Sequence, residues 1–570
     1  MPDLIEQQGP LTAPASKREP FRIALAGCGP KGMYCLERLI QRLNQSDSRD
    51  EIQIIIFDPE NVPGAGPVYH PDQPHYLRMN YASGLIDTWS ESPGSREKDE
   101  YPDLVHWLQR HYPEMADPNG FIPRAVTGEY LADCYKKILQ CCPASCSIEH
   151  RQQKVIDIQR IEHRWMLKTN ASAEIYDEVL ISIGHEGWRS AADNQDQPET
   201  VIPHVFPVTE MLTYGRIPAG SRVAVRGFAL TFIDACLALT EGRGGSFSCQ
   251  QGEWKYQRSG NEVDCILPFS RSGRPMFPKP DKHRLSLPDQ LETIWEQGRS
   301  RLMHLDQPEQ GLEFKSMIWP VILQTAAKAL VLVNPEQFPE MKPTTKQLAH
   351  WYNQWTSSTC SGAEVFALLK HAYHVATGRE QPDEIWAVGE TFRQLYSALV
   401  RRISHGGLSV SSWHEFSECA VEMERLAFGP PAENVGRMLA LIEAGLINLD
   451  FLKGSVVQKE HTLKLTQQGR AIDVDRLVHA VIPHSQQFAK DSILSKIISA
   501  GWARCIQGAG GIEVNRSGRP VAVTGEIMRG LAVIGRATEG CVLGNDTLTR
   551  LLHKHPDQWA RSVCRRIQQR

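Results

Sequence analysis

The stretch RIALAGCGPKGMYCLERLI, residues 22–40, decides the fold, because an apolar strand-like run leads through three glycines into an amphipathic helix. Gly27, Gly29 and Gly32 form a GxGxxG motif. In such a motif the first glycine allows a tight turn, the second leaves room for a pyrophosphate, and the third lets helix and strand approach closely. The N-terminus of the helix then faces the anion. The stretch therefore predicts the phosphate-binding turn of a Rossmann-like unit.

A second apolar run, IQIIIFD at residues 52–58, supports this prediction. It ends in Asp58, near the distance expected for a carboxylate that binds a ribose hydroxyl. Together the two runs predict a dinucleotide-binding fold, and the alternative is a Rossmann unit that holds no ligand.

Composition limits the class of protein. With 570 residues, 41% of them hydrophobic and 22% charged, the chain is typical of a soluble protein of two or three domains. A net charge of −4 without a long basic run argues against nucleic-acid or membrane-surface binding. No stretch approaches the roughly 18 apolar residues of a membrane span.

The cysteines predict a reducing compartment. The 14 cysteines are scattered and no secretory leader precedes them, so we expect free thiols and a cytoplasmic protein. Cys141, Cys142 and Cys146, with His150, lack the two spaced ligand pairs of a zinc module, so no metal is expected. No CxxC motif occurs, which argues against a dithiol relay.

After Asp58 the chain departs from an ordinary dehydrogenase, because a long loop rich in glycine and proline replaces the next βα unit. This loop carries PGxGxxY at residues 63–69 and LxxN at residues 77–80. Further on come FIPRAVTGEYL from residue 121, YDEVLISIGH from residue 176 and LAVIGRATEG from residue 531. With these elements in this order, the sequence resembles the FAD-NAD(P)-binding protein family, which includes flavin-dependent N-monooxygenases such as aspartate N-monooxygenases.

The resemblance implies an FAD site. It implies that the flavin-side turns are the ISIGH segment and the terminal GRATEG segment. For Tyr69 and Arg124, a buried structural hydrogen bond is the alternative. His185 is a candidate for proton transfer, although a lone histidine is more often structural. The implied FAD-binding residues are Gly27, Gly29, Gly32, Asp58, Gly66, Tyr69, Asn80, Arg124, Gly184, His185, Thr538 and Gly540.

A second nucleotide unit is predicted from residue 221. A strand-like run leads to Gly227 and then to an apolar helix, although Ala229 and Phe232 replace the second and third glycines of the motif. A later apolar run ends in Ser270, Arg271 and Arg274, a basic strand end that can pair with a 2′-phosphate and so favours NADPH over NADH. The alternatives are that these arginines bind an anionic substrate or lie in water.

The remaining chain predicts a helical insertion. Residues 390–403 place Phe392, Leu395, Tyr396, Leu399 and Ile403 on one helical face, and a second helix is predicted from Val435. The fold class is therefore α/β, with two Rossmann-like units and a mainly helical insertion that covers the flavin or forms an oligomer interface. The predicted divisions are a disordered arm at 1–20, a FAD-binding domain at 21–220, an NAD(P)-binding-like domain at 221–300, the insertion at 301–472, and a return to the first domain at 473–570.

These cofactors allow three functions. The favoured hypothesis is an FAD- and NADPH-dependent monooxygenase that uses O2 to oxidise the amine of a small amino acid in natural-product biosynthesis; the resemblance implies that it acts through a flavin C4a-hydroperoxide. The alternatives are an NAD(P)H oxidoreductase with a non-oxygen acceptor and a flavin-binding regulatory or scaffold protein. Cofactors of this kind carry the chemistry themselves, so no catalytic side chain is nominated. Substrate identity and oligomeric state stay open.

Overall fold

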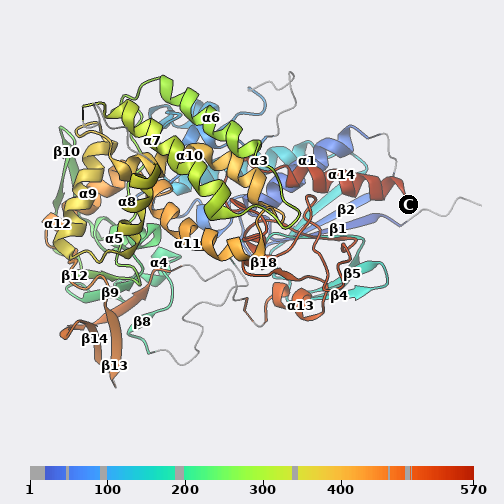
Figure 1. Ribbon diagram of the computed structural model, residues 1–570. Helices are drawn as coiled ribbons and strands as arrows, with labels where there is room; N and C mark the ends of the chain where they lie inside the picture. The colour runs from blue at the N-terminus through green and yellow to red at the C-terminus, as the bar shows by residue number, and fades with distance from the viewer. Residues whose placement is uncertain are drawn as a thin grey trace, which may run out of the picture.

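The structure is a computed structural model that describes residues 19–46, 50–89, 99–185, 198–336, 345–459, 462–481, 488–489 and 491–570. The predicted N-terminal arm, residues 1–20, lies outside the described residues except for its last two. Figure 1 shows two strand-containing regions bridged by a group of helices.

The first sheet is parallel throughout and has five strands in the order β19-β7-β1-β2-β3. Its central strand is buried on both faces: Ile23 and Leu25 enter one core, and Ala24 and Ala26 enter the other. This explains why the run is apolar throughout instead of alternating. The strands are β1 (Phe21–Ala26), β2 (Ile52–Phe57), β3 (Cys146–Arg151), β7 (Glu178–Ile181) and β19 (Leu531–Val533).

Helices cover one face of this sheet, and a small antiparallel sheet covers the other. The C-terminal helix α14 (His555–Gln568) lies along α1 (Pro30–Asn44), so the two ends of the first unit pack together (Figure 1). The other elements of this unit are α2 (Leu104–His111), α3 (Arg124–Gln140), β4 (Asp157–Ile161), β5 (Arg164–Lys168), β6 (Ala173–Tyr176), α13 (Ile493–Ser499), β17 (Cys505–Ile506), β18 (Gly510–Ile512), and the 3-10 helices η1 (Pro67–Tyr69), η2 (Ser83–Leu85), η3 (Pro113–Met115) and η6 (Arg536–Thr538).

The second sheet is also parallel, with four strands in the order β12-β9-β16-β8. Two of its strands fall outside the predicted range 221–300, because β8 (Val201–Ile202) comes before it and β16 (Arg476–His479) follows the insertion. The predicted return to the first domain at residue 473 is therefore corrected: β16 pairs with β9 (Arg222–Arg226) in the second sheet. The other elements here are α4 (Val208–Met211), α5 (Leu230–Leu239), η4 (Glu241–Arg243), β10 (Ser246–Gln250), β11 (Glu253–Gln257), β12 (Cys265–Phe269), β13 (Ser455–Lys459), β14 (Thr462–Gln467) and β15 (Arg470–Val474).

The insertion is built around the predicted helix. This helix, α10 (Glu384–Ile403), buries Phe392, Leu395, Leu399 and Ile403 in the core of the insertion and leaves Tyr396 half-buried at its edge. The helix predicted from Val435 is also present. The remaining helices are α6 (Gln290–Met303), the π-helical segment η5 (Phe314–Ile318), α7 (Trp319–Val333), α8 (Thr345–Ser357), α9 (Gly362–Ala376), α11 (Val410–Ala427) and α12 (Ala432–Glu443).

One helical stretch corrects the expectation about apolar length. Residues Phe314–Val333, which form η5 and α7, are long and apolar enough to cross a membrane. Half of this stretch is buried inside the protein, and α7 packs against α6 and α10. Its apolar character is thus explained by its place in the core of the insertion.

Candidate functional site

The three glycines of the first motif differ in what surrounds them. Gly27 has a positive φ of +87°, and a Cβ there would lie 2.6 Å from the Ser182 carbonyl oxygen. A Cβ on Gly32 would lie 2.6 Å from the Gly27 carbonyl oxygen. At Gly29, in contrast, a Cβ would meet no protein atom within 4 Å. Packing therefore requires the first and third glycines, whereas Gly29 faces open space at the N-terminus of α1, where a pyrophosphate would lie.

Asp58 lies at the predicted place, directly after β2. Its Oδ2 accepts a hydrogen bond from the Cys28 backbone N–H at 2.6 Å, and its Oδ1 accepts one from the Glu60 N–H at 3.0 Å. Only 5% of the residue is exposed. The carboxylate thus fixes the glycine turn to the end of β2, and its contact with a ribose hydroxyl stays a prediction.

The loop that carries PGxGxxY packs against the glycine turn. The Gly64 N–H donates to the Cys28 carbonyl at 2.6 Å, and a Cβ on Gly66 would lie 3.5 Å from the Gly29 Cα. Tyr69 ends η1 and is half-buried; burial raises the pKa of its hydroxyl to about 12. These contacts place Gly66 beside the open space at Gly29.

Arg124 has a structural partner. Its Nη2 donates to Asp234 Oδ2 at 2.8 Å, and its Nε donates to the Arg78 carbonyl at 3.1 Å. The guanidinium carbon also lies 5.5 Å from the centre of the Phe206 ring. This buried ion pair joins α3 of the first unit to α5 of the second, so it matches the structural alternative given for this residue.

The predicted flavin-side turns lie at the carboxyl ends of neighbouring parallel strands. Gly184 and His185 follow β7, and the segment with Thr538 and Gly540 follows β19. Since β1, β7 and β19 are parallel, their turns share one edge of the sheet. The Thr538 hydroxyl donates to the Gly535 carbonyl at 2.8 Å and accepts from the Asn545 side-chain amide at 3.2 Å, so it is held within the turn. Desolvation and then the charge of Arg536 lower the pKa of His185.

The second sheet brings three predicted residues to one edge. Gly227 follows β9 with a φ of +121°, and a Cβ there would lie 2.3 Å from the Ala480 carbonyl. Ser270 and Arg271 follow the neighbouring parallel strand β12, and Arg271 is exposed. The Ser270 Oγ accepts a hydrogen bond from the Gly273 N–H at 3.0 Å.

Arg274 is placed differently from the prediction. Its guanidinium donates to both carboxylate oxygens of Glu422, at 2.9 and 3.1 Å, and to the carbonyls of Trp355 and Thr356. The residue is only 9% exposed. Arg274 therefore anchors the strand end to α11 of the insertion, and it is removed from the predicted NADPH site.

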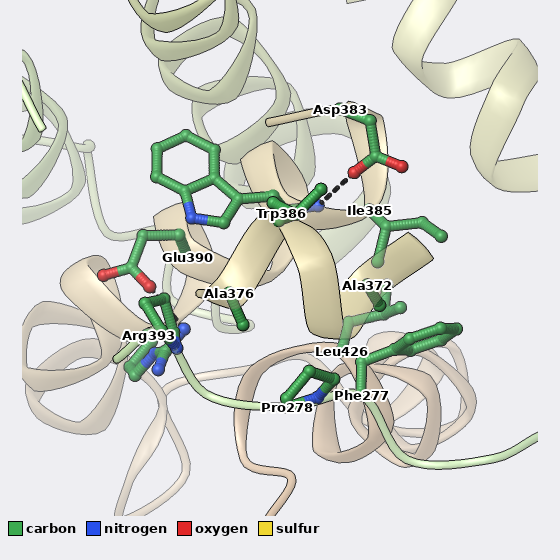
Figure 2. A pocket seen from close by; sticks show the side chains of 12 residues that line it. Phe277, Pro278, Ala372, Ala376, Asp383, Ile385, Trp386, Glu390, Arg393 and Leu426 are labelled. Atoms are coloured by element: carbon green, nitrogen blue, oxygen red, sulfur yellow. Dashed lines mark hydrogen bonds and ion pairs between the residues drawn. The ribbon is translucent and has the colours of Figure 1, made fainter. Parts of the chain in front are cut away.

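Several charged groups were missed by the sequence analysis. Lys31 lies inside the GxGxxG motif, and burial lowers its pKa to about 8. Desolvation of the carboxyl group, and then the charge of Glu539, raises the pKa of Glu424 above its usual value. Lys279 donates a hydrogen bond to the Asn80 carbonyl, and Arg393 of α10 forms an ion pair with Glu390 of the same helix (Figure 2). Lys31 could have been found from the motif, whereas the other three have no local sequence signal.

Within the described ranges no group of three His, Cys, Asp or Glu side chains is arranged to hold a metal ion.

The stacked histidines His553 and His555 make the stability of the folded protein depend on pH. Burial, and then the charge of Lys31, lowers the pKa of His553 to about 4, and burial lowers that of its stacked neighbour His555. An unfolded histidine has a pKa of about 6.5. The folded protein therefore binds fewer protons between about pH 4 and 6.5, and stability should fall as pH decreases through that window.

This pH dependence can be measured by urea unfolding of the FAD-loaded protein at pH 7.5, 6.0 and 5.0. His553→Gln should flatten the loss of stability below pH 6.5, and the same change at the exposed His414 should leave the pH dependence of the parent protein unchanged. Equal slopes for the two variants would contradict the role of His553.

Comparison with known proteins adds to this geometry. The chain is 23% identical over 556 residues to an L-aspartate N-monooxygenase (nitrosuccinate-forming) of Streptomyces davaonensis. This alignment covers 84% of this chain and 85% of that protein. It is 23% identical over 579 residues to the nitrosuccinic acid synthase npaA of Aspergillus oryzae, covering 91% and 88%. Among solved structures, the ornithine N-hydroxylase of Kutzneria sp. 744 aligns with a TM-score of 0.46 at 14% identity, covering 96% of this chain and 99% of that one. Residues 24–186 match the model of the FAD-NAD(P)-binding family.

Proposed function

We propose that this protein is an FAD-dependent, NADPH-consuming monooxygenase that oxygenates the amine of a small, aspartate-like amino acid in natural-product biosynthesis. The observation that carries the proposal is the extent of the similarity to L-aspartate N-monooxygenase. It covers 84% of this chain and so extends well beyond the FAD-NAD(P)-binding domain at residues 24–186. A shared cofactor domain alone would leave the reaction open, because unrelated reactions use the same fold.

The residues at the first glycine turn fit FAD. Open space at Gly29, the N-terminus of α1 and the half-buried Lys31 together form a cradle for a pyrophosphate. FAD, when bound, supplies the redox chemistry between NADPH, O2 and the substrate. The chain positions the cofactor and the substrate, while the insertion restricts access of water to the reacting atoms.

The experiment that tests the proposal follows both electrons and oxygen. FAD-loaded protein is supplied with NADPH, L-aspartate and ¹⁸O2, while NADPH and oxygen consumption are recorded and the products are analysed by mass spectrometry. We expect aspartate to accelerate both rates and the heavy isotope to appear on the product nitrogen. NADPH oxidation by an artificial acceptor without labelled product would indicate the oxidoreductase, and a chain that binds no flavin would indicate a regulatory or scaffold role.

The NADPH preference is assigned to Arg271, which is exposed at the end of β12. A guanidinium there can make charge-assisted hydrogen bonds to a 2′-phosphate, which NADH lacks. We expect Arg271→Ala to raise the Kd for NADPH about tenfold, since a hydrogen bond to a charged group contributes about 1.5–3 kcal/mol. The Kd for NADH should stay within twofold.

Titration of the FAD-loaded protein with each nucleotide, at one ionic strength, measures both constants. Lys255→Ala, on the exposed side of β11, removes the same charge elsewhere on the second unit and serves as the control. Equal losses for NADPH and NADH would remove the assignment of Arg271.

A further inference from the structure

Two cysteines of the first unit, Cys142 and Cys146, lie at the two ends of a tight turn between α3 and β3. The turn is closed by the Cys146 N–H, which donates to the Pro143 carbonyl at 2.8 Å. The Cys142 thiol donates to the Cys146 carbonyl at 3.2 Å, so its sulfur is directed across the turn. The fold thus brings the first sulfur to the residue that carries the second thiol.

Regular structure holds both ends of this turn. Cys146 is the first residue of the edge strand β3, where it pairs with Ile52 of β2, and the Ile52 N–H donates to the Ser145 carbonyl at 2.8 Å. At the other end, the Cys142 N–H donates to the carbonyl of Leu139 in the last turn of α3 at 3.2 Å. A disulfide tolerates only a narrow range of separations, and a turn held in this way keeps the two cysteines close together.

Small oxidants can reach this turn. Cys142 and Cys146 are half-buried, and Ala144 at the tip of the turn is exposed. By contrast, Cys35 and Cys134 are buried in the core of the first unit, and burial raises the pKa of each of these thiols to about 12. Buried thiols of this kind are inert, because the thiolate is the reactive form.

The two thiols of the turn differ in their tendency to ionise. A hydrogen bond with the Cys146 thiol lowers the pKa of Cys142, and the same bond raises the pKa of Cys146. The more acidic thiol is the better nucleophile at neutral pH, because more of it is present as thiolate. Cys142 is therefore the attacking sulfur and Cys146 the resolving one, in agreement with the direction of the Cys142 side chain.

Neither of the other candidates in this segment joins the two thiols. The Cys141 sulfur lies 3.5 Å from the Tyr101 hydroxyl, and the His150 Nε2 lies 3.2 Å from the Asp58 carbonyl oxygen. In the part of the chain that the structure describes, no three such side chains are arranged around a metal ion. The geometry therefore favours chemistry between two thiols over metal binding.

We propose that Cys142 and Cys146 form a peroxide-reactive thiol pair that closes reversibly into a disulfide. The Cys142 thiolate attacks one oxygen of hydrogen peroxide and the O–O bond breaks, which gives a sulfenic acid and a hydroxide that is protonated to water. The Cys146 sulfur then attacks the Cys142 sulfur, the S–O bond breaks, and the Cys146 proton leaves with the hydroxyl group as a second water. The two thiols lose two electrons, and the peroxide gains them.

The disulfide protects Cys142, because a sulfenic acid without a partner thiol is oxidised further and irreversibly. Thiol–disulfide exchange with a reducing thiol then restores the pair. This inference goes beyond the proposed function and does not depend on it, because the peroxide can be supplied from outside.

The test uses the FAD-loaded protein without NADPH, so that peroxide comes only from the added solution. After brief treatment with hydrogen peroxide, free thiols are blocked with N-ethylmaleimide and the tryptic peptide 138–151, which carries Cys141, Cys142 and Cys146, is analysed by mass spectrometry. We expect only Cys141 to be blocked and the peptide to lack the two hydrogens lost on joining the other two sulfurs. Dithiothreitol added to the oxidised protein should make all three thiols available again.

Three variants assign the two roles. Cys146→Ser should leave a sulfenic acid at Cys142, which dimedone traps, whereas Cys142→Ser should leave Cys146 largely unreacted. Cys249→Ser removes an exposed cysteine of β10 and should leave the bridge unchanged. The flavin content of each variant checks that it is folded.

The rate of bridging gives a second readout. In the parent protein the bridge should form about tenfold faster than Cys249 is oxidised, because exposure alone does not activate a thiol. The pair would be overturned if Cys142 and Cys146 stayed open to N-ethylmaleimide after peroxide, or if the bridge joined Cys141 to Cys142. A bridge that forms no faster than the oxidation of Cys249 would overturn it as well.

Discussion

Replacing Gly29 with valine is expected to weaken FAD binding strongly while the fold persists. A Cβ at this position meets no protein atom within 4 Å, and the backbone φ of −67° suits any L-residue. The added side chain would instead occupy the space of the pyrophosphate at the N-terminus of α1. If this clash costs as much as overpacking in a protein core, about 1–3 kcal/mol, FAD affinity should fall by about 5- to 150-fold.

The neighbouring glycines make this prediction specific. A Cβ on Gly32 would lie 2.6 Å from the Gly27 carbonyl oxygen, so Gly32→Ala should lower the thermal stability even without FAD. The FAD content is measured by flavin absorbance after purification, and the fold by circular dichroism and thermal melting. If Gly29→Val retained full flavin content, the assigned position of the pyrophosphate would be wrong.

The first unit was predictable because its signals are local. The apolar run of β1, the glycine spacing and the start of α1 lie within about twenty residues, so backbone geometry and sequence pattern coincide. The sequence gives less information about which sheet each strand joins. β16 has the same apolar pattern as a strand of the first sheet, and only its pairing with β9 places it in the second.

Two arginines show why charged site residues are hard to predict. Arg124 is bound by Asp234, which is 110 residues away in the sequence, and Arg274 is bound by Glu422, which is 148 residues away. An arginine at a strand end has the same local pattern whether it meets a phosphate or a distant carboxylate.

Glu178 should be among the most sensitive positions for stability. This first residue of β7 is fully buried, and its Oε1 accepts hydrogen bonds from Arg519 Nη1 at 2.5 Å and Trp559 Nε1 at 2.9 Å. Its Oε2 is bound by Arg566 of α14. One carboxylate thus joins the first sheet to two separate segments of the C-terminal part of the chain.

We expect Glu178→Gln to lower the free energy of unfolding by about 3–5 kcal/mol, because it leaves the buried Arg519 guanidinium and the partly buried Arg566 guanidinium without this counter-charge. Glu149→Gln removes an exposed partner of Arg151 and should cost about 1 kcal/mol or less. Urea unfolding of both variants, with FAD bound, gives the comparison. Adding Arg566→Met to Glu178→Gln removes one of the two uncompensated charges and should restore part of the loss. If the double variant were no more stable than Glu178→Gln alone, the loss would come from packing around Glu178 and not from unbalanced charge.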